Sequence, residues 1–396
     1  MAKSEKTTVN HAERAHALLS ASGASRWINC TPSPRLEESF PQSSSFFAEE
    51  GTLAHEFAEI NLKHQLALLT DKQYEVLAGP FRSSPHYSED MEEEVQKHID
   101  YVIQQYTEAK RLTPDAVLLI EDKIDLTAFI EDGFGTSDDT IIADGTLEVI
   151  DLKYGKGLRV SAEDNSQLKL YGLGALYANE LAYDIHTVRL TIVQPRLDAI
   201  SSWEVSAEDL KKWGEEVVRP KALEAYAGEG KQAPGEWCQF CKAKPKCRAL
   251  SEYSLEVAKK EFRDPQLLSD KEVLEAFEKS GLITNWLASV GSYIFDEALA
   301  GKKWEGYKLV EGRSNRVISN PDLAEQALID AGFEKDQFTN TKLKGLGDLE
   351  KLLKKDRFST LLGAYVTKPE GKPTLAPESD KRDEYGIAQA VRDFED

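Results

Sequence analysis

The chain has 396 residues, 41% of them hydrophobic, so it is long enough for two or three domains with a substantial buried core. Its formal net charge of -20 argues against a protein that coats nucleic acid indiscriminately, because clustered Lys and Arg bind a phosphate backbone, but a local basic track would still suffice for a nuclease. No apolar run approaches the ~20 residues needed to cross a bilayer, and the polar start MAKSEKTTVNHAER lacks the apolar segment of a signal peptide. We therefore expect a soluble, cytoplasmic protein that does not bind a membrane.

Residues 1–20 are predicted to form a weakly helical, frayed leader. The segment SASGASRWINC follows and places Cys30 just before the proline-rich TPSPRLEESFP. A lone cysteine is most often a small buried thiol, so Cys30 gains meaning only beside the cysteines described below.

Apolar residues at three- and four-residue spacing predict a helix from Phe46 to about Leu69. His55 and Glu59 are four residues apart and share a face of this helix. A lone helical histidine is usually a packed or surface residue, but a neutral imidazole is also a good metal ligand. Glu59 is then placed to orient that ring, or a metal-bound water. A second amphipathic helix is predicted over 89–112, and we assign it no chemistry.

Strands are predicted next. Val117 to Leu126 reads as the first strand, and a looser segment, 127–134, leads into a hairpin. The two arms of the hairpin, Thr140 to Ala143 and Leu147 to Lys153, flank the turn Asp144-Gly145. Together these segments supply three mostly antiparallel strands.

Acidic residues stand at the ends of this hairpin. Asp138 comes just before the first arm, and Asp151-Leu152-Lys153 closes the second. Alternate residues of a strand share a face, so Asp151 and Lys153 should point the same way while Leu152 turns into the core. Strand pairing should bring Asp138 close to Asp151. Two carboxylates beside one lysine form a hard-oxygen site suited to Mg²⁺ or Mn²⁺.

A glycine-opened loop with two cations, Lys156 and Arg159, follows the second arm, and the alternative interpretation is an ordinary solvated turn. The next predicted helix, from about Asn165 to Leu176, places Gln167 and Tyr171 on one face. Both side chains can hydrogen-bond a phosphate or the lysine. A further strand is predicted over 188–194 and helix again over about 207–226.

The remaining three of the four cysteines fall in one short window. Cys238, Cys241 and Cys247 have the spacing C-x2-C-x5-C, so their thiolates can converge from a tight loop. In a reducing cytosol such a cluster favours metal ligation over disulfides. Four thiolates can hold either a tetrahedral Zn²⁺ or a [4Fe-4S] cluster.

Four motifs, in their order along the chain, resemble those of a known family. Gly51-Thr52-x-x-His55, Gly135-x-x-Asp138, Asp151-x-Lys153 and Gln167-x-x-x-Tyr171 resemble the motifs of RecB-like nucleases in the PD-(D/E)xK superfamily. This resemblance implies an α/β (α+β) fold, with an αβββαβ core and a central mixed sheet flanked by helices. Asp139 is a rival for Asp138, which we prefer because it matches the G-x-x-D form.

The resemblance also implies roles for residues. The implied catalytic residues are Asp138, Asp151, Lys153, Gln167 and Tyr171. The implied ligands of one or two Mg²⁺ or Mn²⁺ ions are His55, Asp138, Asp151 and the Leu152 backbone carbonyl. Glu59 would contact His55 or a metal-bound water without binding the ion itself. The basic loop carrying Lys156 and Arg159 is implied to face the nucleic-acid backbone.

One cysteine before the nuclease core and three after it is similar to the pattern of RecB-like nucleases with an iron–sulfur cluster. For Cys30, Cys238, Cys241 and Cys247 this implies a [4Fe-4S] cluster, with Zn²⁺ as the alternative, that ties the two ends of the core together. The nuclease domain is then expected over 21–250. A mainly helical C-terminal region with an extended tail is expected over 251–396.

The implied function is a metal-dependent DNA nuclease. An exonuclease that acts on ends or single strands is the first expectation, and a structure-specific or nicking endonuclease is the runner-up. The non-enzymatic alternative is a DNA-binding or scaffold protein with an inactive nuclease core. The layout of this acidic chain also resembles a phage-encoded family, which implies a role in phage recombination or replication in the bacterial cytoplasm. A phage recombination or replication protein would then contact the C-terminal region.

Overall fold

The structure, a computed structural model, describes residues 17–41, 46–157, 159–260, 269–305 and 307. Most of the expected leader, and the expected C-terminal region beyond residue 307, lie outside these residues. The chain divides into two compact units, Met1–Leu309 and Val310–Asp396, and only the first is described below. Helices α9 (Arg248–Lys260) and α10 (Asp270–Leu299) lie in the same unit as the sheet.

The centre of the fold is a five-stranded mixed sheet in the order β1-β2-β3-β4-β5. The strands are β1 (Val117–Asp125), β2 (Phe134–Ile142), β3 (Gly145–Leu152), β4 (Ile185–Gln194) and β5 (Ala199–Ser206). Neighbouring strands pair antiparallel except for β3 and β4, which are parallel. Parallel neighbours require a crossover, which α6 (Ser166–Asn179) supplies. The expected α+β class with a central mixed sheet is confirmed.

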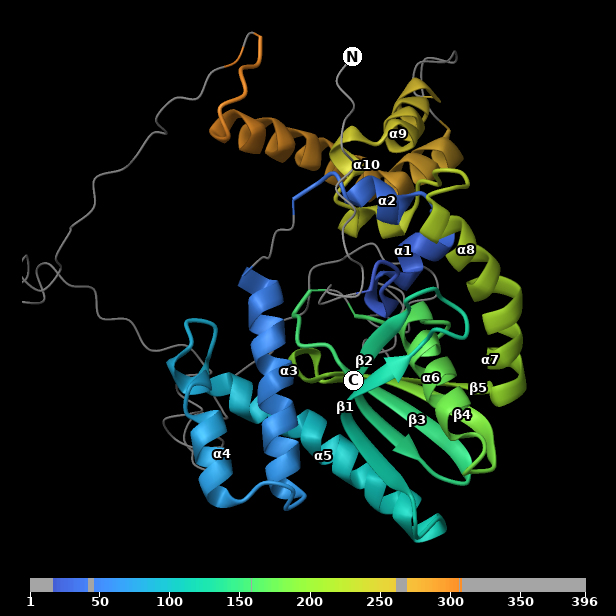
Figure 1. The fold of residues 1–396 in the computed structure, drawn as a ribbon. Helices are drawn as coiled ribbons and strands as arrows, with labels where there is room; N and C mark the ends of the chain where they lie inside the picture. The colour runs from blue at the N-terminus through green and yellow to red at the C-terminus, as the bar shows by residue number, and fades with distance from the viewer. Residues whose placement is uncertain (1–16, 42–45, 158, 261–268, 306, 308–396) are drawn as a thin grey trace, which may run out of the picture. The chain divides into compact units, whose positions relative to one another are not determined.

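Helices cover both faces of the sheet (Figure 1). On one face, α3 (Phe46–Gln65), α4 (Asp71–Ala78) and α5 (Glu89–Leu112) bury an apolar cluster that includes Phe57, Ile150 and Leu152. On the other face, α6 packs together with α1 (Ala24–Asn29), α7 (Ala207–Trp213) and α8 (Arg219–Ala227). The short helix α2 (Ser33–Glu37) contacts α8. Residues near Asp151 therefore lie between two separately packed helical layers.

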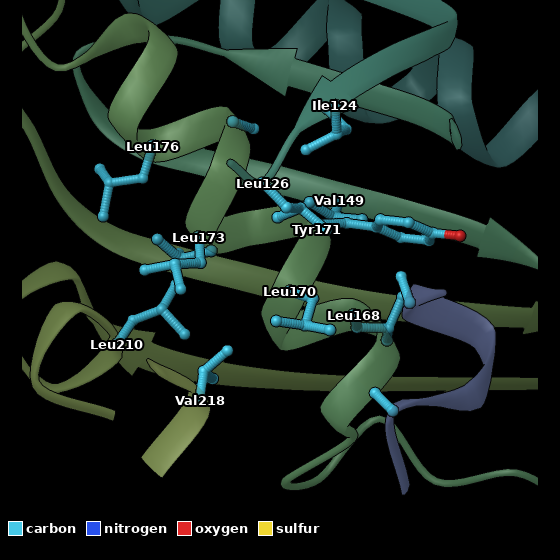
Figure 2. Close-up of a cluster of buried hydrophobic side chains, with 14 of the residues drawn as sticks. Ile124, Leu126, Val149, Leu168, Leu170, Tyr171, Leu173, Leu176, Leu210 and Val218 are labelled. Atoms are coloured by element: carbon cyan, nitrogen blue, oxygen red, sulfur yellow. The ribbon is translucent and has the colours of Figure 1, made fainter. Parts of the chain in front are cut away.

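Helix α6 is apolar on nearly all sides because it is sandwiched between the sheet and the outer helices. Figure 2 shows its Leu168, Leu170 and Leu173 in the buried cluster, while the Tyr171 hydroxyl extends beyond it. Gly174 permits this close approach, since a Cβ there would lie 2.3 Å from Ile124 Cγ2. The side chain of Asn165 caps the helix by accepting hydrogen bonds from the Gln167 and Leu168 amides.

Two strands differ from the prediction. β2 begins at Phe134, so Asp138 lies inside a strand and not before it. The polar run Ser137 to Thr140 hid this strand, because it lacks the apolar alternation that marks one. β5 was not predicted. Its alternate residues are exposed along an edge strand, and only the intervening ones, such as Trp203, pack inward.

Within the described residues, no helix is both long enough and apolar enough to cross a membrane.

Candidate functional site

Four elements bring the predicted site residues together. His55 comes from α3, Asp138 from β2, Asp151 from the end of β3 with Lys153 just after it, and Gln167 from α6. His55 Nδ1 lies 3.2 Å from Asp138 Oδ1. The other oxygen of Asp138 accepts a hydrogen bond of 2.7 Å from the Leu152 backbone amide, so the Asp138 carboxylate is held at the point where β2 meets the end of β3.

A hydrogen-bonded network links the second carboxylate to α6. Lys153 Nζ lies 2.8 Å from Asp151 Oδ2 and donates to Gln167 Oε1 at 3.2 Å. The Gln167 side-chain amide donates to Asp151 Oδ1 and to the Tyr171 hydroxyl, both at 3.3 Å. Gln167 therefore contacts the other three polar groups.

The glycine of the G-x-x-D motif makes room for Tyr171. A Cβ on Gly135 would lie 2.7 Å from Tyr171 Cε1, closer than van der Waals contact allows. Tyr171 is 6% exposed, so its ring has little freedom to move aside. The spacing of Gly135 and Asp138 thus places a ring and a carboxylate at the same stretch of β2.

The regular alternation of β1 breaks beside this site. Residues at even spacing share a face of a regular strand. Leu118 and Ile120 pack on the α3–α5 face, but Ile124, an even number of residues further on, packs on the opposite face, under α6. Between them, Glu121 has a φ of 51°, a left-handed conformation that costs a non-glycine residue about 1–3 kcal/mol. Such strain, found at a cluster of ionisable groups, is typical of functional sites.

Strand β2 shows the same break opposite Glu121. Ile120 pairs with Asp139 and Asp122 with Ser137, so Asp138 stands across from Glu121. The side chains of Ser137 and Thr140 are three residues apart, yet they hydrogen-bond at 3.0 Å and therefore share a face. Both Asp138 and Asp139 consequently line one cavity, where regular alternation would separate them.

This cavity lies between α3, α5 and the sheet. His55, Glu59, His98, Glu121, Asp138 and Asp139 supply its polar lining. Within the described chain, His55, Glu121 and Asp138 are the one group of at least three His, Cys, Asp or Glu residues whose ligand atoms all lie within 4.8 Å of one another. One imidazole nitrogen and two carboxylate oxygens at such spacing fit a divalent cation such as Mn²⁺.

The electrostatics of these three residues are interdependent. Burial opposes protonation of His55, but the Asp138 carboxylate outweighs it and raises the pKa of His55 to about 9. Burial likewise disfavours the charged form of Asp138, yet His55 and Lys153 hold the pKa of that carboxyl below its usual range. Burial and then the nearby Asp138 raise the pKa of Glu121 to about 7. At neutral pH a cation would therefore compete with protons on His55 and Glu121.

Two further carboxyl groups are buried more deeply. Burial raises the pKa of Asp151 despite the opposing charge of Lys153, and it raises the pKa of Asp139 despite a hydrogen bond from His98. Burial alone would lower the pKa of Lys153, but Asp151 raises it, so Lys153 keeps its positive charge.

Other expectations fare differently. Glu59 was expected to orient His55 or a metal-bound water. Its carboxylate pairs with Lys63 at 2.5 Å, and Asp138 contacts the His55 ring instead. Lys63 follows Glu59 by four residues on the same helix, a spacing that favours such an ion pair. The contact of Glu59 with a metal-bound water stays a prediction. Lys156 and Arg159 are exposed in the loop between β3 and α6, and their contact with a nucleic-acid backbone stays a prediction. The same holds for a metal contact of the Leu152 carbonyl.

All four cysteines line a second cavity. Cys30 follows α1, Cys238 lies in the turn η6 (Glu236–Phe240), and Cys247 follows the turn η7 (Lys244–Lys246). Cys30, Cys238 and Cys241 are buried. Burial raises the pKa of each of these thiols, that of Cys241 to about 12, so ligation of a metal would displace their protons.

The spacing of the sulfurs bears on which group could bind. Four thiolates on a single zinc, each about 2.3 Å from it, would lie roughly 3.8 Å apart. In the described chain no three cysteine sulfurs all lie within 4.8 Å of one another.

The peptide segments that carry the cysteines are also joined by polar contacts. Arg35 Nε donates to the Tyr226 carbonyl at 2.8 Å, and Thr31 Oγ1 donates to the Glu229 carbonyl at 2.7 Å. Glu37 accepts a hydrogen bond of 2.7 Å from the Lys242 amide. Helix α10 packs beside η6 and η7. The two ends of the predicted nuclease region are thus held together by the protein itself.

Glu121, Asp139 and His98 were not among the predicted site residues. His98 left a signal, since it occupies the apolar face of α5 together with Val95, Ile99 and Val102, where a polar residue needs a partner. Asp139 was considered and set aside in favour of Asp138. Nothing in the periodicity of β1 marks Glu121, because its position depends on the local break in alternation.

A solved structure titled "Crystal structure of SSO0001" is similar to this chain at 14% sequence identity, over 55% of this chain and 95% of that one. Its TM-score of 0.21 is too low to support any statement about fold or function. Residues 16–383 match the family model described as "Protein of unknown function (DUF2800)". Because this match spans most of the chain, the protein belongs to the DUF2800 family.

Proposed function

We propose that the protein is a metal-dependent DNA nuclease that hydrolyses phosphodiester bonds. An exonuclease is the first proposal, and a structure-specific or nicking endonuclease is the second. The observation that carries the proposal is the convergence of His55 and Asp138 with the Asp151–Lys153 pair at the meeting of β2 and β3. The preference for an exonuclease on ends or single strands, in phage recombination or replication, rests on family resemblance.

His55, Glu121 and Asp138 would hold a divalent cation, with Asp151 as a further carboxylate across the paired strands. When bound, such a cation supplies Lewis-acid stabilisation of the phosphate and lowers the pKa of a water. His55 must lose its proton to become a ligand. Asp138 is already fixed by the Leu152 amide, so its carboxylate needs no rearrangement to bind.

Lys153 would act on the phosphate or on the attacking water. Its ammonium is held by Asp151 and Gln167, so it is a positioned positive charge and not a mobile one. Such a charge stabilises the negative charge that develops as the phosphodiester bond breaks. Gln167 would fix that position, and Tyr171 would support Gln167 through its hydroxyl.

One digestion experiment separates the proposed activity from its alternatives. Full-length protein is incubated with Mn²⁺ and either end-labelled linear DNA or covalently closed circular DNA. Loss of linear DNA alone supports the exonuclease, and cutting of circles supports the endonuclease. Intact DNA of both kinds would contradict the nuclease and leave the DNA-binding alternative, while an Asp151→Asn variant controls for contaminating nucleases.

For the cysteines we propose a [4Fe-4S] cluster with a structural role. Support comes from the shared cavity and the burial of three of the four thiols, and the choice of [4Fe-4S] over Zn²⁺ rests on the family resemblance. Cys30 and the other three cysteines lie on segments that the fold already joins, so a cluster would reinforce that junction.

A further inference from the structure

Two buried carboxylates of the sheet contact polar side chains of α5, and they differ in whether both of their oxygens have partners. His98 Nε2 lies 2.8 Å from Asp139 Oδ2, and the Tyr101 hydroxyl donates to Glu148 Oε1 at 3.4 Å. Both carboxylates are buried, with Asp139 2% and Glu148 4% exposed. Glu148 also accepts a hydrogen bond of 2.8 Å from Thr191 and lies 3.5 Å from Arg189, so both of its oxygens have partners inside the protein.

Asp139 is not satisfied in this way. Its Oδ1 is fully buried, and it has no hydrogen-bond partner within the described chain. Leaving a buried polar group unpaired costs about 1–3 kcal/mol, so a partner from outside the protein is expected. Asp139 and His98 line the cavity that also contains His55, Glu121 and Asp138. The cavity is partly open to solvent and has room for about one water.

We propose that Asp139 takes part in divalent-cation binding through an ordered water, and that His98 is the positioning residue that holds Asp139 for this task. The inference rests on the metal site of the proposed function. Asp139 is outside the set of ligand atoms that lie within 4.8 Å of one another, so a water must bridge it to a cation held by that set. Groups behind metal ligands tune cation affinity without touching the ion.

His98 suits the positioning role because both it and Asp139 are buried. Its side chain is 1% exposed and packs among Val95, Ile99 and Val102 on the buried face of α5. With Oδ2 held by His98, Oδ1 is the oxygen of Asp139 that has no partner in the described chain, on a residue that lines the cavity. A contact that served only to attach α5 to the sheet would not need the second oxygen.

The test measures Mn²⁺ binding to the full-length protein without DNA, by isothermal titration calorimetry. Asp139→Asn should raise the Kd for Mn²⁺ by about 10–100-fold, the usual effect of removing a group that supports metal ligands. His98→Gln should raise the Kd in the same direction. If His98 acts only through Asp139, the double variant should bind no more weakly than Asp139→Asn.

Glu148→Gln is the matched control, since it alters the other contact between α5 and the sheet, away from the cavity. It should leave the Kd within about twofold, as expected for a site without shared partners. Equal weakening by Glu148→Gln would overturn the proposal, because general loosening of α5 would then explain the effect. A wild-type Kd in Asp139→Asn would overturn it as well.

Thermal unfolding without metal establishes that each variant is folded. If Asp139→Asn does not fold, His98→Gln carries the test, and a folded His98→Gln with a wild-type Kd overturns the role of His98. Failure of this inference is distinct from failure of the nuclease proposal. DNA cleavage by the wild type together with normal Mn²⁺ binding by Asp139→Asn would remove only the inference. If the Kd values for Mn²⁺ change as predicted in the variants but the wild type cleaves no DNA, only the nuclease proposal is contradicted.

Discussion

His55 Nδ1 lies 3.2 Å from Asp138 Oδ1, so without a cation the site holds a proton where the proposed cation must bind. The Asp138 carboxylate, working against burial, raises the pKa of His55 from 6.5 to about 9. The stabilising ion pair is therefore complete below pH 6.5 and is lost as the pH rises through about 9. Over that same window the imidazole becomes neutral and available as a ligand.

We therefore predict that Mn²⁺ affinity rises between pH 6.5 and about 9, by up to about tenfold per pH unit while one proton is displaced. Calorimetry in buffers of different ionisation enthalpy measures both the affinity and the released proton. A His55→Gln variant should bind more weakly and lose most of the pH dependence above pH 7.5. An affinity in the wild type that stays flat over the window would contradict this assignment.

Lys153→Ala should separate binding from chemistry. The protonated Lys153 contacts Asp151 and Gln167 and has no lone pair with which to bind a cation, so Mn²⁺ binding should stay within a few-fold of wild type. The cleavage rate should fall by about 10²–10³-fold, the usual loss on removing a group that stabilises developing charge. Single-turnover cleavage at saturating Mn²⁺ measures the rate. Wild-type cleavage by the variant would exclude Lys153 from the mechanism.

Glu121→Gln should have opposite effects on stability and on binding. Burial, followed by the charge of Asp138, raises the pKa of Glu121 from 4.5 to about 7, so the folded state holds this proton more tightly than the unfolded state. Stability of the metal-free protein is thus lowered as the pH rises from 4.5 through about 7. Above pH 7 the variant should have a Tm about 2–4 °C higher than wild type.

The same Glu121→Gln variant should bind Mn²⁺ more weakly, because it loses a carboxylate of the ligand set. Glu59→Gln is a suitable comparison, since Glu59 lines the same cavity but pairs with Lys63. It should not raise the Tm above pH 7. A Glu121→Gln variant with lower Tm and unchanged Mn²⁺ affinity would show that Glu121 is only structural.

Gly135→Ala should destabilise the protein, because its new methyl group would lie 2.7 Å from the Tyr171 ring. Forcing a methyl group into a packed core costs about 1–3 kcal/mol. Urea unfolding of both proteins measures this difference in the free energy of unfolding. Gly281→Ala is the control, because no atom lies within 4 Å of a Cβ at that position of α10. The control should be neutral or slightly stabilising, as alanine is in a helix.

Anaerobic purification tests the cysteine site. A [4Fe-4S] cluster would give a brown protein with about four irons and four sulfides per chain. Cys247→Ser should lower the iron content and the Tm together, because the cluster would join segments from both ends of the core. A colourless protein with one zinc per chain would contradict the cluster and favour the Zn²⁺ alternative.

Much of this arrangement follows from local sequence patterns. Two-residue alternation correctly places Asp151 and Lys153 on one face and Leu152 in the core, as their 2.8 Å contact and the burial of Leu152 confirm. Helical spacing likewise places Gln167 and Tyr171 in hydrogen-bond contact. Local periodicity is enough for these residues because each pair lies on a single regular element.

Periodicity could not predict the residues where the elements are irregular. Glu121 reaches the cavity through a left-handed backbone conformation, and Asp138 and Asp139 both reach it because β2 loses its alternation there. His98 joins the site only through the packing of α5 on the sheet. These positions depend on tertiary contacts, and a propensity scale carries no information about them.

The central claim is that a carboxylate–imidazole pair on β2 and α3 binds the cation needed for phosphodiester hydrolysis. Its most direct test compares wild type with Asp138→Asn, which keeps the shape of the side chain, on end-labelled linear DNA in Mn²⁺. We predict cleavage by the wild type and a loss of at least about 10³-fold in the variant, with loss of Mn²⁺ binding. Equal cleavage by the two proteins, or no cleavage by either, would contradict the claim.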